Sequence, residues 1–582
     1  MTKRFLSLAV LLALLTGLVA GCVQPAPMAP AESAAPAAAG DAGASAATDA
    51  APGAIQPGGT WTRVTIADAS IINPILSSDS ASSAVEAMLF PGLIGQDPVT
   101  GEFTPDGSMS ESWTVSEDGL TWTFKLRDGI TWSDGDPVDA ADFKYTYDAI
   151  ASDLVETVRK SLVEPIESIT VVDPLTVEVK FREVRCDAIT NVGLGWLPSH
   201  LYAADFSDIM TSPLNDEPAV SAGPFAFQSW TRDDNTILVR NQGYWEGAPN
   251  MDGMIYRIVP DAGARLAQLQ SGEVDTVGIE PAQLTAVQGN PDINVYRFED
   301  DGYDYIALNQ ANPANPQPGK DENGNLISQD PHPILGDLAV RQAIAQAVDY
   351  TSIIENVYLG QGYQIASNVL PAVSWAHDSE LPPYAYNPDQ ARQLLEGAGW
   401  VDGNNDGIRE KDGQALRLTL LTNAGNKTRE DLGVLVQDQL NAIGFDITFE
   451  AIDFGTMVDR MLGQTYDMVI IGWTGLGADP NDDAFWKSDF DTPGSGFNFV
   501  SFQSARIDEL LTQGVTVPGC APEDRAPIYK EIQQIIHEQA PYIFISGGVG
   551  NIGYRNNWGN VDPGPWSFYW NVHTWYNRAL QP

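Results

Sequence analysis

Apolar and polar residues alternate along much of the chain, and their spacing predicts both strands and helices. In residues 120–126 every second side chain is apolar; the sequence Arg127-Asp128-Gly129 follows, and then a second apolar stretch at residues 130–132. Two such stretches separated by a glycine turn are typical of a β-hairpin. Asp139 precedes a run to Ile150 with helical periodicity, which predicts a helix capped by this aspartate.

In the second half of the chain, helical and strand patterns alternate more regularly. Its helical patterns cover residues 335–357, 389–398 and 430–443. Its strand patterns cover residues 416–421, 445–451 and 466–471, and the last is apolar enough to be buried on both faces. Strands that alternate with helices indicate an α/β domain built around a largely central sheet.

The N-terminus carries an export signal. Lys3 and Arg4 precede an apolar run at residues 5–20, which is shorter than the ~20 residues of a membrane span, and small residues lead to Cys22. The sequence around the cleavage site resembles the lipobox of bacterial lipoproteins, which implies that Cys22 is acylated. The alternative is an ordinary signal peptide, in which Cys22 would be removed together with the signal. Residues 23–60, rich in Ala, Pro, Gly and Ser, predict a disordered tether. We therefore expect a protein that lies outside the cytoplasm, in the periplasm or on the cell surface, and is anchored to the membrane by lipid.

Composition narrows the function further. The chain of 582 residues has 77 acidic and 31 basic residues and a net charge of −46, which argues against nucleic acid as a partner. Its length predicts two or three domains. Cys186 and Cys520 are too far apart for their spacing to decide whether they pair. A glycosidase would need two carboxylates flanking a sugar bond, and no pair stands out; a surface adhesion protein would be expected to show repeats, which are absent.

A series of motifs runs through the chain from residue 61 to the end. These are Asn73-Pro74, residues 111–129 and 132–138, Ala222-Gly223-Pro224-Phe225 with Trp230, Tyr244-Trp245, residues 270–275, 340–344 and 387–391, Trp473 with Asp479-Pro480, and Ala540-Pro541. In this order they resemble the extracellular solute-binding protein family 5, the peptide, dipeptide and nickel binding proteins of ABC importers.

The resemblance implies an α/β, bilobal periplasmic-binding-protein-like fold of type II, cluster C, with an extra domain in the first lobe. The implied first lobe comprises residues 61–100, 185–305 and 541–582, the extra domain residues 101–184, and the second lobe residues 306–540. Such a receptor closes on a solute and presents it to an ABC transporter permease. We expect a monomeric binding protein, not an enzyme, with a peptide as the first choice of solute and an oligosaccharide or another non-peptide solute as the alternative.

Ligand-binding candidates gather in residues 472–482, the loop that follows the buried strand at residues 466–471, because such loops are common binding sites. Peptide-binding relatives carry an aspartate for the peptide's ammonium three positions after a tryptophan; here Leu476 takes that position after Trp473, and Asp479 is the nearby carboxylate. The candidate ligand residues are Trp473, Asp479, Trp486, Phe497, Asn498, Asn309 and Ser80.

One further loop has its own chemistry. Residues 402–413 begin like a calcium-binding EF-hand loop but carry Gly413 in place of the final glutamate. The candidate ligands of a structural calcium are Asp402, Asn404, Asp406, Ile408, Glu410 and Asp412. The alternative is a polar turn that joins a helix to a strand. We expect no other cofactor.

Overall fold

The computed structural model describes residues 55–321 and 323–581. Cys22, the predicted signal peptide and most of the predicted tether lie outside these residues. Within the described chain, no helix is both long enough and apolar enough to span a bilayer.

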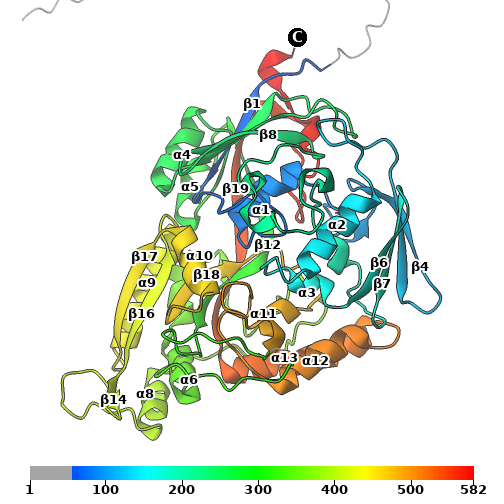
Figure 1. Ribbon diagram of the computed structural model, residues 1–582. Helices are drawn as coiled ribbons and strands as arrows, with labels where there is room; N and C mark the ends of the chain where they lie inside the picture. Colours follow the sequence, from blue (N-terminus) through cyan, green and yellow to red (C-terminus); the bar gives the residue numbers. More distant parts are fainter. Residues whose placement is uncertain (1–54, 322, 582) are drawn as a thin grey trace, which may run out of the picture. The chain divides into compact units, whose positions relative to one another are not determined.

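A large mixed sheet runs through the described chain (Figure 1). Its strands, in spatial order, are β17 (Asp446–Ile452), β16 (Arg417–Asn423), β18 (Met468–Trp473), β12 (Ile293–Leu308), β19 (Tyr542–Arg555), β11 (Thr276–Gly278), β1 (Thr60–Thr65), β10 (Gly253–Ile258), β9 (Asn235–Arg240) and β8 (Phe225–Thr231), with β13 (Gly362–Tyr363) beside β19. β16 is parallel to both β17 and β18, as expected for an α/β unit.

The two long strands β12 and β19 join the two halves of this sheet. The first part of β12 pairs with the end of β19 beside β11, and its last part pairs with β18 and the start of β19. The register shifts between Glu299 and Tyr303, where the halves meet. One half has a buried core that includes Trp61, Phe225 and Met254. The other has two, one with Leu418 and Ile470 and one with Phe544. We call the part of the molecule that contains β1 the β1 half, and the part that contains β18 the β18 half.

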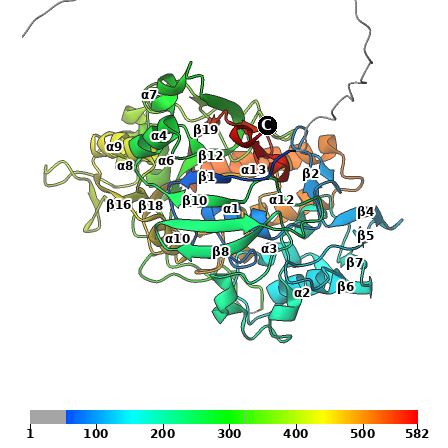
Figure 2. The same ribbon diagram turned by 90° about the horizontal axis from the view of Figure 1, so that it is seen from above.

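A separate four-stranded antiparallel sheet corrects one sequence prediction. Its order is β4 (Ser110–Val115), β5 (Thr121–Leu126), β7 (Thr176–Phe181) and β6 (Ile166–Asp173), and its labels lie together in Figure 2. The predicted hairpin of residues 120–126 with 130–132 is wrong, because β5 pairs with β4 and β7. Residues 130–132 instead lie antiparallel to residues 136–138, with Val138 N donating to Ile130 O at 3.0 Å.

Most predicted helices are confirmed. Asp139 caps α2 (Ala140–Ala151) by accepting from the backbone N of Ala141, and α8 (Pro388–Gly397) and α9 (Lys427–Asn441) occupy predicted positions. The predicted helix at residues 335–357 is two helices, α6 (Leu338–Ala347) and α7 (Tyr350–Asn356). The chain breaks there because the side chain of Asp349 accepts from Ser352 N and starts a new helix.

The remaining elements surround the two sheets. The helices are α1 (Ser80–Leu89), α3 (Lys160–Val163), α4 (Ala262–Ser271), α5 (Leu284–Val287), α10 (Phe454–Leu462), α11 (Asp483–Trp486), α12 (Ala505–Thr516) and α13 (Pro522–Gln539). Three short strand pairs complete the set: β2 (Gly95–Gln96) with β3 (Phe103–Thr104), β14 (Glu410–Lys411) with β15 (Gln414–Ala415), and β20 (Trp558–Gly559) with β21 (Tyr576–Asn577). The lobe boundaries predicted from the resemblance stay predictions, because the described residues belong to one compact unit.

A disulfide bond joins Cys186 to Cys520, which settles the pairing that the spacing left open. Cys186 lies two residues before Ala188, which packs in the core of the β1 half. Cys520 lies between α12 and α13, whose apolar faces pack in the core of the β18 half. The backbone N of Cys186 also donates to Val515 O at 2.7 Å, so the bond ties the two halves together at a point of direct contact.

Candidate solute-binding site

The loop of residues 474–482 leaves the buried strand β18 at Trp473. The ring of Trp473 stacks on Phe485 of α11 with 4.3 Å between centroids, and it meets Phe497 edge-on at 5.4 Å. All three rings are half-buried. The structure therefore brings together two of the predicted ligand residues, Trp473 and Phe497, in one aromatic cluster at the end of a central strand.

Asp479 lies in the same loop but has a counterion within the protein. Both of its carboxylate oxygens accept from the guanidinium of Arg525, at 2.7 and 2.9 Å. The Arg525 side chain is 4% exposed and also donates to Gly514 O and to the hydroxyl of Tyr529. A carboxylate held bidentately by a buried arginine has little left to offer a cationic solute.

Three other candidate ligand residues lie in the core. Trp486, Asn498 and Asn309 are each 0% exposed. The side-chain amide of Asn498 donates to the backbone oxygens of Lys487 and Phe502, and that of Asn309 donates to those of Gln464 and Tyr466. In this structure none of the three presents a surface to a solute, and the two asparagines bind the backbone of their own half.

Ser80 is exposed and begins α1 in the β1 half, apart from the aromatic cluster in sequence and in core. Its neighbour Asp79 caps α1 by accepting from Ser82 N at 2.8 Å. Ser78 and Asp79 line a cavity of about 370 Å³ that also takes Asp453 and Asp459 from the β18 half. This cavity lies between the two halves, where a hinged receptor would hold its solute.

A second cavity of about 260 Å³ also takes residues from both halves, among them Ile66, Arg265, Asp304 and Asn426. Asp300 lines it, and burial together with the nearby charges of Asp301 and Asp304 raises the pKa of Asp300 to about 6. Both cavities provide room for a solute between residues of the two halves, and acidic side chains outnumber basic ones in the lining of each.

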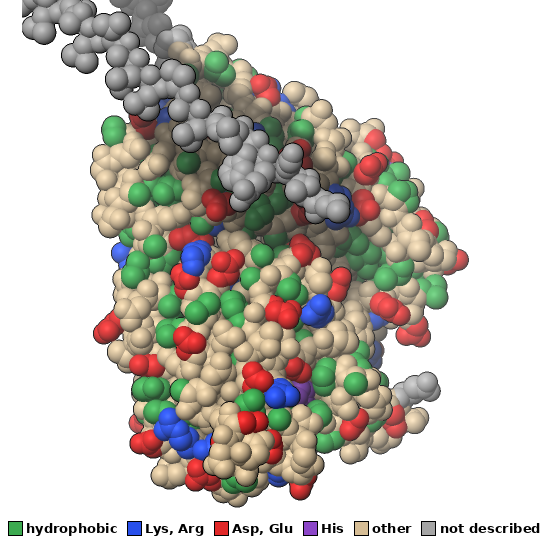
Figure 3. Space-filling view, turned by 90° about the vertical axis from the view of Figure 1, so that its left-hand side faces the viewer, with side chains coloured by type: hydrophobic (Ala, Val, Ile, Leu, Met, Phe, Trp, Pro, Cys, Tyr) green, Lys and Arg blue, Asp and Glu red, His purple; other side chains and the backbone are tan. Residues whose placement is uncertain are grey.

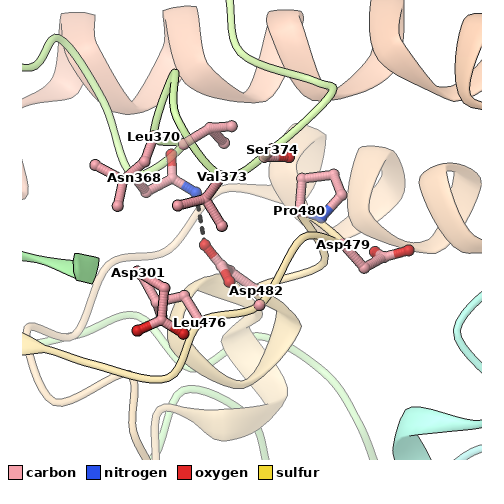
Figure 4. A pocket seen from close by; sticks show the side chains of 11 residues that line it. Asp301, Asn368, Leu370, Val373, Ser374, Leu476, Asp479, Pro480 and Asp482 are labelled. Carbon is pink, nitrogen blue, oxygen red and sulfur yellow. Dashed lines mark hydrogen bonds between the residues drawn. The ribbon is translucent and has the colours of Figure 1, made fainter. Parts of the chain in front are cut away.

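A small recess opens beside the loop, lined by Asp482 together with Asn368 and Asp301 from distant segments (Figure 4). The side-chain amide of Asn368 donates to Oδ2 of Asp482 at 2.8 Å, and Asp301 accepts from Gly475 N at 3.0 Å. Burial raises the pKa of Asp482 to about 7. Sequence reasoning missed Asn368 and Asp301, because no local pattern marks residues that meet the loop only through the tertiary fold.

Residues of the β1 half also contact the loop of residues 474–482. The side-chain amide of Asn481 donates to Asp187 at 2.8 Å, and Asp187 is bound bidentately by Arg185 at 2.7 and 2.8 Å. Arg185 also lies 3.9 Å from the carboxylate of Asp483. Because Arg185 and Asp187 flank Cys186, the disulfide and this buried ion pair fasten the β1 half directly to the candidate site.

The calcium hypothesis stays a prediction. Within residues 402–413, Asp402 accepts from the backbone N of Asp406 and of Gly407, and the side-chain amide of Asn404 donates to Glu410 at 2.7 Å. In the described part of the chain, no three histidine, cysteine, aspartate or glutamate side chains are grouped as a metal site would need. The loop oxygens thus serve as turn acceptors in this geometry.

Comparison with known proteins decides the family. The profile of the bacterial extracellular solute-binding proteins, family 5, matches residues 104–495, more than half of the chain. The chain belongs to this family.

Two relatives with similar sequences show how far the match of this family 5 chain extends. It is 28% identical over 535 residues to the oligopeptide-binding protein AppA of Bacillus subtilis (strain 168), covering 90% of this chain and 92% of that protein. It is 25% identical over 507 residues to the dipeptide-binding protein of Escherichia coli (strain K12), covering 81% and 86%.

Solved structures agree with the fold. The structure of AppA from Bacillus subtilis in complex with a nonapeptide matches with a TM-score of 0.82 at 26% identity, covering 90% of this chain and 100% of that one. NikZ from Campylobacter jejuni in complex with Ni(L-His) matches with a TM-score of 0.76 at 24% identity, covering 89% and 99%. The family 5 chain therefore has the bilobal periplasmic-binding-protein-like fold, and the predicted fold class is confirmed.

Proposed function

We propose that this family 5 receptor captures a peptide between its two halves and delivers it to an ABC transporter permease. The observation that carries the proposal is the match to AppA over 90% of the chain, combined with cavities lined by both halves. We also propose that lipid on Cys22 keeps the receptor near its permease, which raises the local concentration of loaded receptor.

The geometry supports capture by closure. A solute that contacts both halves stabilises the closed arrangement over the open one, because only the closed arrangement offers both sets of contacts. The crossing strands β12 and β19, with the register shift between Glu299 and Tyr303, are the part of the sheet where a change in angle between the halves would be absorbed.

The surface supports a small solute over a nucleic acid. Figure 3 shows acidic side chains, in red, spread over one face with fewer basic ones between them. An acidic surface of this kind repels phosphate backbones and leaves anionic polymers without a docking face.

Tryptophan fluorescence tests the proposal. Tripeptides to pentapeptides should change the emission of the wild-type protein and of Trp570→Phe, a matched control at a residue that is 46% exposed. The change should be smaller in Trp473→Phe, because that ring lies at the candidate site.

Recovery of the peptides unchanged after incubation is expected for a binding protein. Hydrolysed peptides would contradict the binding-only role, and an absence of any fluorescence or calorimetric response would contradict peptide capture.

A further inference from the structure

The two halves of the molecule are connected in two different ways. The strands β12 and β19 cross between the halves, with the register shift between Glu299 and Tyr303. The disulfide between Cys186 and Cys520 is a second, covalent connection, and its two Cα atoms lie 5.2 Å apart. Because a disulfide holds its Cα atoms within about 7 Å of each other, the segments that it joins cannot part when the halves separate elsewhere.

Non-covalent contacts reinforce the molecule around this bond. We call this region the disulfide edge, and it comprises residues 185–187 of the β1 half together with residues 481–483 and 515–520 of the β18 half. Asp187 accepts from the side-chain amide of Asn481 at 2.8 Å, and Arg185 lies 3.9 Å from the carboxylate of Asp483. The side chains of Arg185 and Asp187 are each only 4% exposed, so salt screens these contacts little.

The opposite edge of the molecule lacks such connections. Here the cavity of about 370 Å³ separates residues 67–79 and 232–233 of the β1 half from residues 453–459, which include the start of α10. We call this region the α10 edge. Within residues 55–321 and 323–581, no hydrogen bond or ion pair joins its two sides. Figures 1 and 2 both place α10 on the left and α12, which precedes Cys520, on the right.

Charge also favours separation at the α10 edge. Asp233 of the β1 half and Asp459 of the β18 half both line the cavity and are exposed, and neither has an ion-pair partner in the described part of the chain. Arg232 lines the cavity as well, but its guanidinium pairs with Asp216 of its own half at 2.9 Å. Carboxylates on both sides of the cavity repel each other, so no electrostatic attraction holds this edge closed.

The second cavity, of about 260 Å³, lies beside the crossing strands and not at a free edge. Asp300 and Gly548, which flank the register shift, form part of its lining. Thr428 of the β18 half and Glu280 of the β1 half also line it, and the Thr428 hydroxyl donates to Glu280 at 2.7 Å. Strands and hydrogen bonds therefore join the halves here, which leaves the α10 edge as the place where they can part.

We propose that the disulfide is a second pivot of this receptor, so that the halves part at the α10 edge and the solute enters and leaves there. Two fixed connections between rigid bodies, here the crossing strands and the disulfide, leave a rotation about the line through both. This rotation widens the α10 edge and keeps the loop of residues 474–482 in contact with the β1 half. The inference rests on the proposed function, since it states how the two halves admit a solute.

Distances between spin labels test the pivot without a known solute. Nitroxides are attached to p-acetylphenylalanine, which requires no new cysteine, at exposed positions on each side of both edges. One pair replaces Asp234 and Asp459 at the α10 edge, and the other replaces Glu183 and Glu523 at the disulfide edge. Electron–electron double resonance of the otherwise wild-type protein should give a broad distance distribution at the α10 edge and a narrow one at the disulfide edge. Equal widths, or a broader disulfide edge, would overturn the proposal.

Loss of the disulfide should release the second edge. The distribution between positions 183 and 523 should broaden in the double variant Cys186→Ser, Cys520→Ser, and also in the protein with native cysteines after treatment with a phosphine reductant. The reductant gives the same information on protein that has already folded, should the variant fold poorly. A distribution that stays narrow after reduction would show that the disulfide is not the pivot.

Release of bound peptides tests the exit. Asp459→Lys places a cation across the cavity from Asp233 and should slow the release of a tripeptide-to-pentapeptide mixture by about two- to fivefold at low salt, and less at high salt. The control Asp438→Lys makes the same change at an exposed position on α9 and should leave the rate unchanged. Equal rates in both variants would overturn an exit at the α10 edge. If peptides bind to none of these proteins while the two label pairs differ as expected, peptide capture fails and the pivot stands.

Discussion

Removal of the Cys186–Cys520 disulfide is expected to destabilise the protein strongly. The two cysteines are separated by 334 positions, so the bond restricts a very large loop of the unfolded chain. The loop-closure relation gives an entropy of roughly 19 cal/mol/K for a loop of this length, or about 6 kcal/mol at 25 °C as an upper bound. Because native disulfides generally contribute about 2–5 kcal/mol, we expect the double variant Cys186→Ser, Cys520→Ser to lose free energy of unfolding in that range.

Guanidinium unfolding followed by circular dichroism measures this effect. The double-serine variant should unfold at a lower denaturant concentration and with a larger m-value, because its unfolded chain is less compact and exposes more surface. Wild-type protein under a chemical reductant serves as the control and should resemble the variant. The folded state should persist, since the backbone hydrogen bond from Cys186 to Val515 does not need sulfur. Identical midpoints and m-values with and without the bond would refute the reasoning.

Three further predictions concern single groups. Burial raises the pKa of Asp482 to about 7, so between about pH 4 and pH 7 the folded state holds a proton that the unfolded state has lost. The free energy of unfolding should therefore fall by up to about 4 kcal/mol as the pH rises through this window. Urea unfolding measures this fall, which should be smaller in Asp482→Asn. An Asp482→Asn profile as steep as the wild type's would contradict this. Arg525→Met leaves Asp479 unpaired and should cost about 3 kcal/mol in the same assay, whereas Arg506→Met, which removes only exposed ion pairs, should shift the midpoint little; equal shifts would contradict the importance of burial. Calcium should raise the melting temperature if residues 402–413 bind it, and Asp402→Asn should abolish the rise; no rise in the wild type would reject the calcium hypothesis.

Local chemistry was the most predictable part of the fold. Asp139 starts α2 as its position before a helical pattern indicated, because a capping side chain acts within three residues of itself; Asn387 caps α8 in the same way. The wrong hairpin at residues 120–132 shows the limit. The alternation identified the strand β5, but its partners were decided by packing against β4 and β7, the latter about 55 positions away.

The sequence predicts a candidate site in the loop after β18, and the structure brings only some of the predicted ligand residues together there. The loop after β18 was expected because ligands bind beyond the ends of buried strands, and Trp473 and Phe497 do meet there. Asn309 and Asn498 have amide side chains of the kind that bind ligands, yet each donates hydrogen bonds to backbone oxygens of its own half. Asn368 reaches the site only because the tertiary fold brings two distant segments together, which no periodicity records.

The solute that accompanies the purified protein offers the most direct test of the central claim. Denaturation should release it, and mass spectrometry should identify it. We predict short peptides, absent from a preparation that was unfolded, washed and refolded before the analysis. Recovery of an oligosaccharide, a metal chelate or another non-peptide solute would contradict peptide capture.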